Sequence, residues 1–313
     1  PGWLSVEAAR KVLQELKTKG EDRVVEVLVM AGEVQPKSRL RRHWYMRIMD
    51  ICREALGCGF LPHTNVGPLS RSEMEGLASV NASMGLMLEQ IAPRLQHKGE
   101  VHEKAPSKAP DLRIQQLEMA GQLRIPFTTG LLLGIGEGPA DRIRTLEAIA
   151  ESHARHGHIQ EVILQPHSLG GQQRYRGDAD WAIDLLPDLV ETARDMLPAD
   201  VKLQVPPNLV LVPGIRGRED ILKACLDAGA RDLGDISSLD EVNPDYAFPS
   251  VDSAEDPSPD VCAALETDAP EAHEKRTLKA ILSSWGCSLE ERLLVHPALR
   301  GWMRPAPKAV AAA

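Results

Sequence analysis

A chain of 313 residues is long enough for one large α/β barrel or for two smaller domains. Its 43% hydrophobic and 26% charged residues are typical of a globular enzyme, and no apolar run is long enough to span a membrane. The formal net charge of -9 argues against general nucleic-acid binding, which needs a basic face to neutralise phosphates. We therefore expect small-molecule partners, with neither nucleic acid nor a membrane among them.

The cysteines indicate the compartment of the protein, and the first residues bear on where the chain begins. Five cysteines, an odd number at scattered spacings, indicate a reducing compartment, the cytoplasm, and no disulfide framework. They are Cys52, Cys58, Cys225, Cys262 and Cys287, and they form no recognisable metal quartet. The chain begins PGWLS, without an initiator Met or the features of a signal peptide, so we expect it to be cut from a longer protein.

Helical and strand patterns alternate along the chain, starting with a helix over residues 5–19. The predicted strands span residues 24–30, 59–63, 83–88, 128–135, 161–165, 202–205 and 231–233. The predicted helices between them span residues 45–56, 71–80, 112–123, 141–156, 181–197 and 219–228. This alternation indicates βαβ crossovers and a parallel sheet. Seven strands after an unpaired helix predict an α/β fold, a (β/α)8-type barrel whose first strand is missing, and a half or three-quarter barrel is the alternative.

Two stretches fall outside the alternation. Residues 93–111 form a polar, Lys-rich loop, which is either a lid over the barrel mouth or a solvated loop. Residues 249–274 are acidic and rich in Pro and Ser, which is typical of a linker. We therefore expect a barrel over residues 1–248, this linker, a C-terminal helical segment over residues 275–304 and a disordered tail over residues 305–313.

Polar residues and glycines collect around the ends of the predicted strands. Because the carboxyl ends of parallel strands meet at one mouth, these residues predict a pocket for a polar, hydrogen-bonding small molecule. The set after the strands comprises Gly32, Glu33, His63, Thr64, Asn65, Glu89, Gly134, Gly136, Glu137, Gln165, His167 and Asn208. Ser83 and Glu89, at the two ends of one strand pattern, are functional candidates, whereas the methionines between them are interpreted as core.

Purely structural interpretations exist for several of these residues. Gly134 and Gly136 could make only a tight strand-to-helix turn, and Glu137 could serve only the start of the next helix. His153, His156 and His158 are interpreted as residues of a helix end, solvated or complementing the helix dipole. Nothing matches a Ser/His/Asp triad or a zinc pattern, which argues against a hydrolase.

Taken in order, the strings LPHTNVGPLS, NASMGLMLEQ, AGQLRIPFTTGLLLGIGE, HGHIQEVILQPHS, QVPPNLV and DEVNPDY resemble one family. They are similar to radical S-adenosylmethionine enzymes of the CofG type, the FO synthase subunits of coenzyme F-420 biosynthesis. The resemblance covers about residues 20 to 300. It implies a TIM-like barrel of the radical S-adenosylmethionine type, with the first strand and the cluster loop missing here.

The resemblance also implies a reaction and its cofactors. The family cleaves S-adenosylmethionine with an electron from a [4Fe–4S] cluster, giving a 5′-deoxyadenosyl radical that abstracts hydrogen from the substrate. That substrate is 5-amino-5-(4-hydroxybenzyl)-6-(D-ribitylimino)-5,6-dihydrouracil, which cyclises with loss of ammonia to the deazaflavin FO. The implied partners are a CofH-type partner subunit that supplies this adduct and a reducing electron donor.

Site residues follow from the resemblance position by position, without an assigned catalytic residue. It implies that Gly32 and Glu33 hold the methionyl amino group of S-adenosylmethionine and that residues 134–137 support its adenosine. The implied cofactor-binding residues are Gly32, Glu33, Asn65, Ser83, Glu89, Gly134, Gly136 and Glu137. The implied substrate-binding residues are His63, Thr64, Thr128, Thr129, Gln165, His167 and Asn208.

The chain departs from the family at the cluster. The family's C-x-x-x-C-x-x-C motif is absent from the sequence, and the spacing of Cys52 and Cys58 on a helical pattern does not replace it. We therefore expect no metal ligands in this chain and a fragment that is inert by itself. His167 and Asp235 also replace residues usual in the family. Two alternatives remain: a degenerate barrel that binds S-adenosylmethionine or a flavin-like ligand, and a related radical enzyme with a different substrate.

Overall fold

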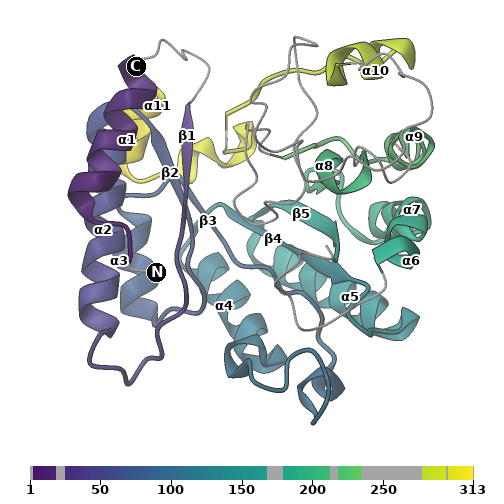
Figure 1. The fold of residues 1–313 in the computed structure, drawn as a ribbon, viewed down its shortest axis with the longest axis horizontal. Coiled ribbons are helices and arrows are strands. Elements are labelled where there is room, and N and C mark those ends of the chain that lie inside the picture. The colour runs from purple at the N-terminus through teal and green to yellow at the C-terminus, as the bar shows by residue number, and fades with distance from the viewer. Residues whose placement is uncertain are drawn as a thin grey trace, which may run out of the picture.

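The computed structural model describes residues 3–18, 25–167, 179–211, 218–234, 277–293 and 295–312. Six parallel strands lie side by side in chain order, β1 to β6, in one curved sheet with helices on its outer side (Figure 1). The strands are β1 (Glu26–Met30), β2 (Leu61–Asn65), β3 (Ser83–Gly85), β4 (Phe127–Leu133), β5 (Ile159–Pro166) and β6 (Lys202–Gln204). The predicted α/β barrel fold class is confirmed.

The helices up to residue 227 are close to those expected from the sequence. They are α1 (Val6–Thr18), α2 (Arg41–Cys58), α3 (Arg71–Ala78), α4 (Pro110–Gln122), α5 (Pro139–His156), α6 (Ala179–Asp184), α7 (Leu186–Met196), α8 (Pro207–Val210) and α9 (Glu219–Asp227). Local signals explain their bounds: Ser70 and Glu73 form a capping box that starts α3, and Gly59 ends α2 with a left-handed φ of 91°.

Two of the predicted elements were wrong in detail. The helix expected over residues 181–197 is two helices, because Pro187 lacks an N–H and is placed at the start of α7. The strand expected over residues 231–233 is a single bridge between Gln204 and Asp232, since β6 itself has only three residues to pair with.

The C-terminal residues form part of the fold. They include α10 (Leu278–Ser284), a 3-10 helix η4 (Pro297–Trp302) and α11 (Pro305–Ala311). The disordered tail expected over residues 305–313 is therefore wrong for α11, which has a proline at its first turn and packs Val310 on an apolar cluster. That cluster joins Val295, Leu299 and Met303 to Leu61 and Ala82, at the amino-terminal ends of β2 and β3. We call residues 285–311 the C-terminal seal, apart from the undescribed residue 294.

The remaining predictions on domain organisation stay predictions. The linker at residues 249–274, the barrel boundary at residue 248 and Asp235 lie outside the described residues. Residues 93–111 contain two short 3-10 helices, η1 (Pro93–Gln96) and η2 (Pro106–Lys108). Across the described ranges, no helix combines the length and the apolar composition that crossing a membrane requires.

Candidate functional site

The register of the sheet separates two faces. Paired residues of neighbouring strands point their side chains to the same face, and successive residues alternate between faces. Val29, Met84, Phe127 and Val162 belong to the main apolar core under the helices. The alternate positions face the barrel interior, where Leu28 and Met30 of β1 remain 42% and 39% exposed. The interior side of the sheet is therefore open to solvent at β1.

A band of polar side chains crosses this interior face from β2 to β5, and we call it the interior belt: His63, Ser83, Thr128 and Glu161. His63 Nδ1 and Ser83 Oγ share a hydrogen bond of 2.7 Å, and Thr128 Oγ1 donates to Glu161 Oε2 at 3.3 Å. Burial lowers the pKa of His63 to about 4, so its imidazole is neutral at pH 7. Gly85 makes room for it, because a Cβ there would lie 2.7 Å from His63 Nε2.

Charged side chains gather beyond the carboxyl ends of β1 and β3, and we call them the mouth cluster: Glu33, Glu89, His102, Lys108 and Arg113. Glu89 lies at its centre, paired with Lys108 and with His102 at 2.9 Å. Arg113 lies 4.0 Å from Glu89 and 3.4 Å from Glu33. Burial alone would raise the pKa of Glu89, but the hydrogen bond from His102 and the charges of Lys108 and Arg113 lower it to about 2.

The backbone holds Glu89 in place. Its N–H donates to Gly130 O at 2.9 Å and its carbonyl accepts from Leu132 N at 3.3 Å, so β4 fixes the segment after β3. Glu89 has a positive φ of 61°, which is uncommon for a residue with a side chain. Because Lys108 and His102 belong to the loop over residues 93–111, that loop is tied across the mouth.

Gly32 and Glu33 follow β1 at the same edge. The Gly32 carbonyl accepts from Trp44 Nε1 at 3.0 Å, and a Cβ at Gly32 would meet nothing within 4 Å. The Glu33 side chain lies over Gly67, where a Cβ would come within 2.4 Å of Glu33 Cγ. Glu33 is thus directed toward Arg113 while its side chain remains 35% exposed.

The turn after β4 is organised by its own glutamate. Glu137 accepts from Gly134 N at 3.1 Å and from Ile135 N at 3.0 Å, and its buried carboxylate lies 3.5 Å from Arg142. Gly134 and Gly136 have left-handed φ values of 82° and 98°. Glu137 therefore shapes the glycine turn from within, and Gly136 is the exposed residue of that turn.

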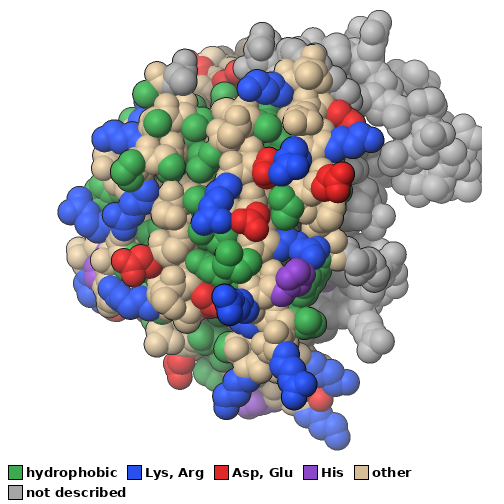
Figure 2. All heavy atoms as spheres, turned by 90° about the vertical axis from the view of Figure 1, so that its left-hand side faces the viewer, with side chains coloured by type: hydrophobic (Ala, Val, Ile, Leu, Met, Phe, Trp, Pro, Cys, Tyr) green, Lys and Arg blue, Asp and Glu red, His purple; other side chains and the backbone are tan. Residues whose placement is uncertain are grey.

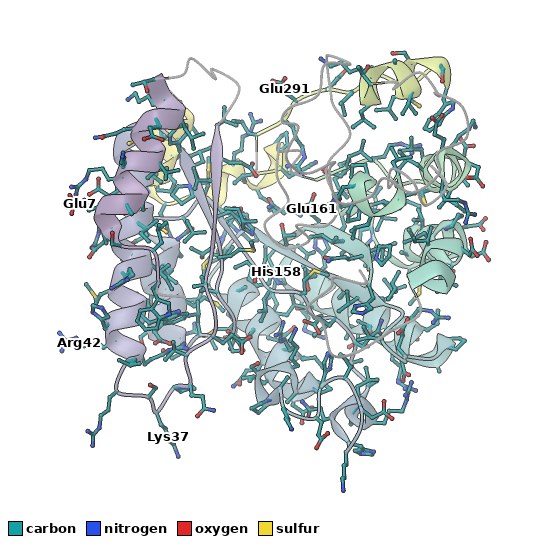
Figure 3. The ribbon with its side chains drawn as sticks, viewed as in Figure 1. Glu7, Lys37, Arg42, His158, Glu161 and Glu291 are labelled. Atoms are coloured by element: carbon teal, nitrogen blue, oxygen red, sulfur yellow. The ribbon has the colours of Figure 1, made fainter. Side chains whose placement is uncertain are left out.

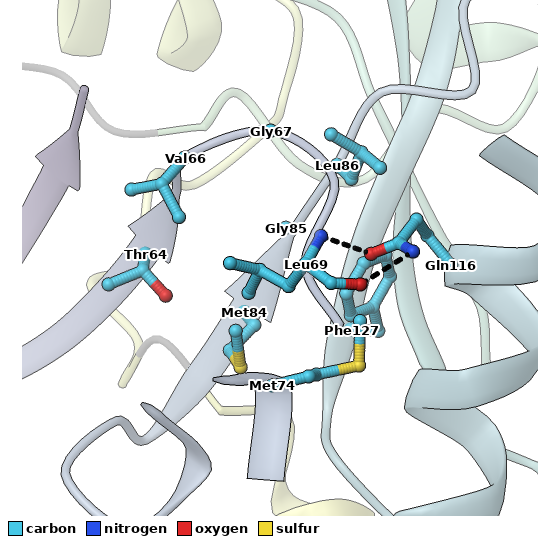
Figure 4. Close-up of a pocket in the computed structure, with 10 residues that line it drawn as sticks. All are labelled: Thr64, Val66, Gly67, Leu69, Met74, Met84, Gly85, Leu86, Gln116 and Phe127. Carbon is cyan, nitrogen blue, oxygen red and sulfur yellow. Dashed lines mark hydrogen bonds between the residues drawn. The ribbon is translucent and has the colours of Figure 1, made fainter. Parts of the chain in front are cut away.

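Two predicted substrate residues lie on the other face of the sheet. Thr64 lines a small cavity between the sheet and α3, together with Met74, Met84 and Phe127 (Figure 4). That cavity has room for little more than a water molecule. Thr129 accepts from Leu88 N at 3.2 Å and donates to Leu86 O at 2.9 Å, which anchors the chain after β3.

The other predicted residues lie around the mouth. Asn65 ends β2 beside Met30, and Gln165 pairs with Leu132 on the interior face. His167 follows β5 and donates its N–H to Leu133 O at 2.7 Å, while Asn208 is buried in α8. The structure thus brings together Glu33 with Glu89, and His63 with Ser83, but not Thr64 or Thr129 with either group.

Sequence reasoning missed several polar residues of the site. Glu161 falls in an apolar strand pattern, and Figure 3 shows it near the middle of the molecule. Arg113 lies on α4 in a pattern typical of a solvated helix, yet its side chain is only 4% exposed. His158 is not part of a helix end as interpreted: it is fully buried between α5 and β5 and packs against Phe127. The sequence signal that could have identified Glu161 is a charged residue inside an apolar run.

Comparisons with known proteins follow this geometry. A 7,8-didemethyl-8-hydroxy-5-deazariboflavin synthase of Thermosynechococcus vestitus is 50% identical over 304 residues, covering 97% of this chain and 85% of that protein. One of the same name from Trichodesmium erythraeum is 48% identical over 301 residues, covering 96% and 83%. No protein-family model matches the chain.

Solved structures show the fold alone. The [FeFe]-hydrogenase maturase HydG of Carboxydothermus hydrogenoformans matches with a TM-score of 0.55 at 13% identity, over 74% of this chain and 51% of that one. Methylornithine synthase matches with a TM-score of 0.53 at 14% identity, over 93% and 75%. The sheet and its outer helices are therefore shared well beyond sequences of recognisable similarity.

Proposed function

The chain belongs to the 7,8-didemethyl-8-hydroxy-5-deazariboflavin synthase family, and on that premise we propose that it serves the formation of the deazaflavin FO. The proposed substrate is the 5-amino-5-(4-hydroxybenzyl)-6-(D-ribitylimino)-dihydrouracil adduct, which cyclises with loss of ammonia. The observation that carries the proposal is the likeness to these synthases along nearly the whole chain. The partner subunit that supplies the adduct, the electron donor and a cytoplasmic location are parts of the same proposal.

The mouth cluster suits the methionyl end of S-adenosylmethionine. That end carries an ammonium and a carboxylate, and the cluster offers partners of both signs. Glu33, which is partly exposed, would take the ammonium, and Lys108, 32% exposed, would take the carboxylate. The backbone of Gly134 and Gly136 would lie against the adenosine. When bound and reduced, this cofactor supplies the species that removes hydrogen from the substrate.

The interior belt suits the substrate. The ribityl chain and the uracil carbonyls of the proposed substrate are uncharged groups that form hydrogen bonds. The belt offers hydroxyl and imidazole groups that donate and accept such bonds. Thr128 and His63 face the interior directly, and Gln165 and Asn65 lie higher toward the mouth. His167 and Asn208 would contact the substrate from the ends of β5 and β6. Thr64 and Thr129 would support these strands from behind.

The described residues do not fit a [4Fe–4S] cluster. Cys52 and Cys225 are buried on α2 and α9, Cys58 is half-buried, and Cys287 is exposed after α10. Within the described ranges, no group of three His, Cys, Asp or Glu side chains could hold a metal ion. Reaction therefore requires thiolates beyond those in the described part of the chain.

Binding of S-adenosylmethionine tests the proposed cofactor site. Glu33→Gln removes one negative charge at a half-exposed position, so we expect the fold to persist and affinity to fall about tenfold or more. Isothermal titration calorimetry of the wild-type chain and this variant measures the change. Glu7→Gln, on the exposed side of α1 (Figure 3), is the matched control and should bind as the wild type does. Equal affinity of all three proteins would contradict the assignment of Glu33.

A reconstitution experiment tests the cluster assignment. After anaerobic treatment with iron and sulfide, this chain should show no [4Fe–4S] absorption and should release no 5′-deoxyadenosine from S-adenosylmethionine. Formation of either would show that ligands outside the described residues complete the site. The lack of fitting ligands in the described part also favours the second candidate function, a barrel that binds S-adenosylmethionine or a flavin-like ligand without turnover. Deazaflavin fluorescence in the presence of the adduct would exclude that candidate.

A further inference from the structure

Glu161, the last member of the interior belt, belongs to a charged group whose other two members have no role in the proposed function. Arg292 reaches the barrel from the C-terminal seal and contacts two carboxylates. Its Nη2 lies 2.8 Å from Glu161 Oε1 and 2.6 Å from Asp232 Oδ2, and its Nε donates to Asp232 Oδ2 at 2.6 Å. Glu161 and Asp232 are therefore held beside the same guanidinium. One guanidinium thus joins β5, the bridge residue after β6 and the C-terminal seal.

Charge is not balanced in this group. The side chains of Glu161 and Asp232 are 7% and 8% exposed, and within the described ranges Arg292 is the cation that forms ion pairs with both. Burying a net negative charge is costly, so the group favours keeping one proton. Burial and the neighbouring Asp232 raise the pKa of Glu161 well above its usual range, although Arg292 opposes this. Glu26 of β1 adds a further negative charge, and Lys202 is the neighbour of Glu161 across β5 and β6.

We infer that Glu161 and Asp232 share one proton under the hold of Arg292, and that this neutralised pair is the floor on which an uncharged, ribityl-bearing pyrimidinedione binds. The ligand class rests on the proposed function. Thr128 joins the pair to the interior belt, because its hydroxyl donates to Glu161 Oε2 and accepts from Gln160 Nε2, each at 3.3 Å. Arg292 acts as a positioning residue: it orients both carboxyl groups and sets how readily they lose the proton.

Ligand binding and the proton are then linked. A ligand that fills the interior displaces the water that would otherwise solvate a charged pair, so it binds best when the pair is neutral. Affinity should be constant below the pKa of Glu161 and should fall about tenfold per pH unit above it. Because the pKa of Glu161 is raised, the fall should begin above neutral pH.

Riboflavin is a suitable probe, since it carries a ribityl chain on a pyrimidinedione and is uncharged near neutral pH. Its affinity is measured by fluorescence quenching between about pH 6 and pH 9. Glu161→Gln keeps the size and hydrogen bonding of a protonated acid, so the affinity of this variant for riboflavin should not fall at high pH. Arg292→Gln removes the positive charge that lowers the pKa of Glu161, so the fall in riboflavin affinity should move to higher pH. Glu118→Gln is the control, because the pKa of Glu118 is lowered to about 2 and it does not titrate in this range.

Infrared difference spectroscopy reads the same proton without any ligand. The wild-type chain should show the carbonyl band of a protonated carboxyl group at pH 7, lost at higher pH and missing from Glu161→Gln. Lack of that band in the wild-type chain overturns the shared proton, whatever the chain binds. If the band is present but riboflavin affinity does not change with pH, or riboflavin does not bind, the proposal that the pair forms the binding surface for this ligand class is wrong. Calorimetric binding of S-adenosylmethionine at the mouth is a separate result, so a failure here is distinguishable from a failure of the proposed function.

Discussion

Glycine has two different roles in the site, and single substitutions separate them. At Gly130 a Cβ would lie 2.3 Å from the Ile163 carbonyl oxygen of the neighbouring strand, so the strands pair closely only because no side chain intervenes. At Gly32 the same Cβ would meet nothing within 4 Å. The glycine at residue 32 is therefore not required by packing, and contact with the cofactor is the role that we propose for it.

Alanine substitutions test this difference. Gly130→Ala should lower the free energy of unfolding by about 1–3 kcal/mol, because backbone atoms must move to admit the methyl group. Gly32→Ala should leave stability within about 0.5 kcal/mol of the wild type and weaken binding of S-adenosylmethionine. Urea denaturation and calorimetry measure the two effects. A destabilised Gly32→Ala protein would place the glycine in the fold and remove it from the cofactor site.

At the scale of one element, β4 shows how adjacent residues divide between structure and ligand. Thr129 faces the helices and binds the backbone at Leu86 and Leu88, while Thr128 faces the interior and contacts Glu161. Alternation along a strand separates the two hydroxyls by one residue and by the thickness of the sheet. The sequence string TTG predicts neither role, because both threonines fit an apolar strand equally well.

Valine in place of each threonine keeps the shape and removes the hydroxyl. Thr129→Val should cost about 1–3 kcal/mol of unfolding free energy, since a buried N–H and a buried carbonyl lose their partner. Thr128→Val should cost less, because its hydrogen bonds are 3.3 Å long, and should weaken riboflavin binding instead. Thermal and urea unfolding, with fluorescence titration, separate the two. Similar stability losses in both variants would contradict the division between the faces.

At the scale of the whole molecule, the C-terminal residues pack against elements from the first part of the chain. Figure 1 shows α11 near α2, which it contacts, and the C-terminal seal covers the amino-terminal ends of β2 and β3. On the outer face of α1 and α2, by contrast, apolar, basic and acidic side chains are interspersed (Figure 2). Leu299 is 7% exposed within the seal, whereas Leu40 is 56% exposed at the start of α2.

These two leucines form a matched pair. Leu299→Ala should lower the free energy of unfolding by about 2–4 kcal/mol through lost burial and a residual cavity. Leu40→Ala should change it by less than about 0.5 kcal/mol. Equilibrium urea denaturation compares them, and an equally small effect at Leu299 would show that the seal contributes little to the fold.

Sequence alone could predict the strands and most helices, because buried parallel strands are continuous apolar runs and their helices are amphipathic. It could not predict α11, since seven residues of Pro, Ala, Lys and Val read as a frayed end until their apolar contacts are known. At the site, Glu33 and Glu89 were found because they follow strands. Lys108 lies in the loop over residues 93–111, for which the sequence predicts either a lid or a solvated loop. The convergence of His102, Lys108 and Arg113 on Glu89 depends on how that loop folds back, which no periodicity encodes.

Glu89 shows how these scales meet. One carboxylate receives Lys108 and His102 from the same loop, while its backbone is bonded to β4 on both sides. A cation that enters the mouth and competes for this carboxylate therefore competes with the loop for its anchor. On the proposed cofactor assignment, exchange of S-adenosylmethionine and release of this loop would be coupled through one glutamate whose backbone is bonded to β4.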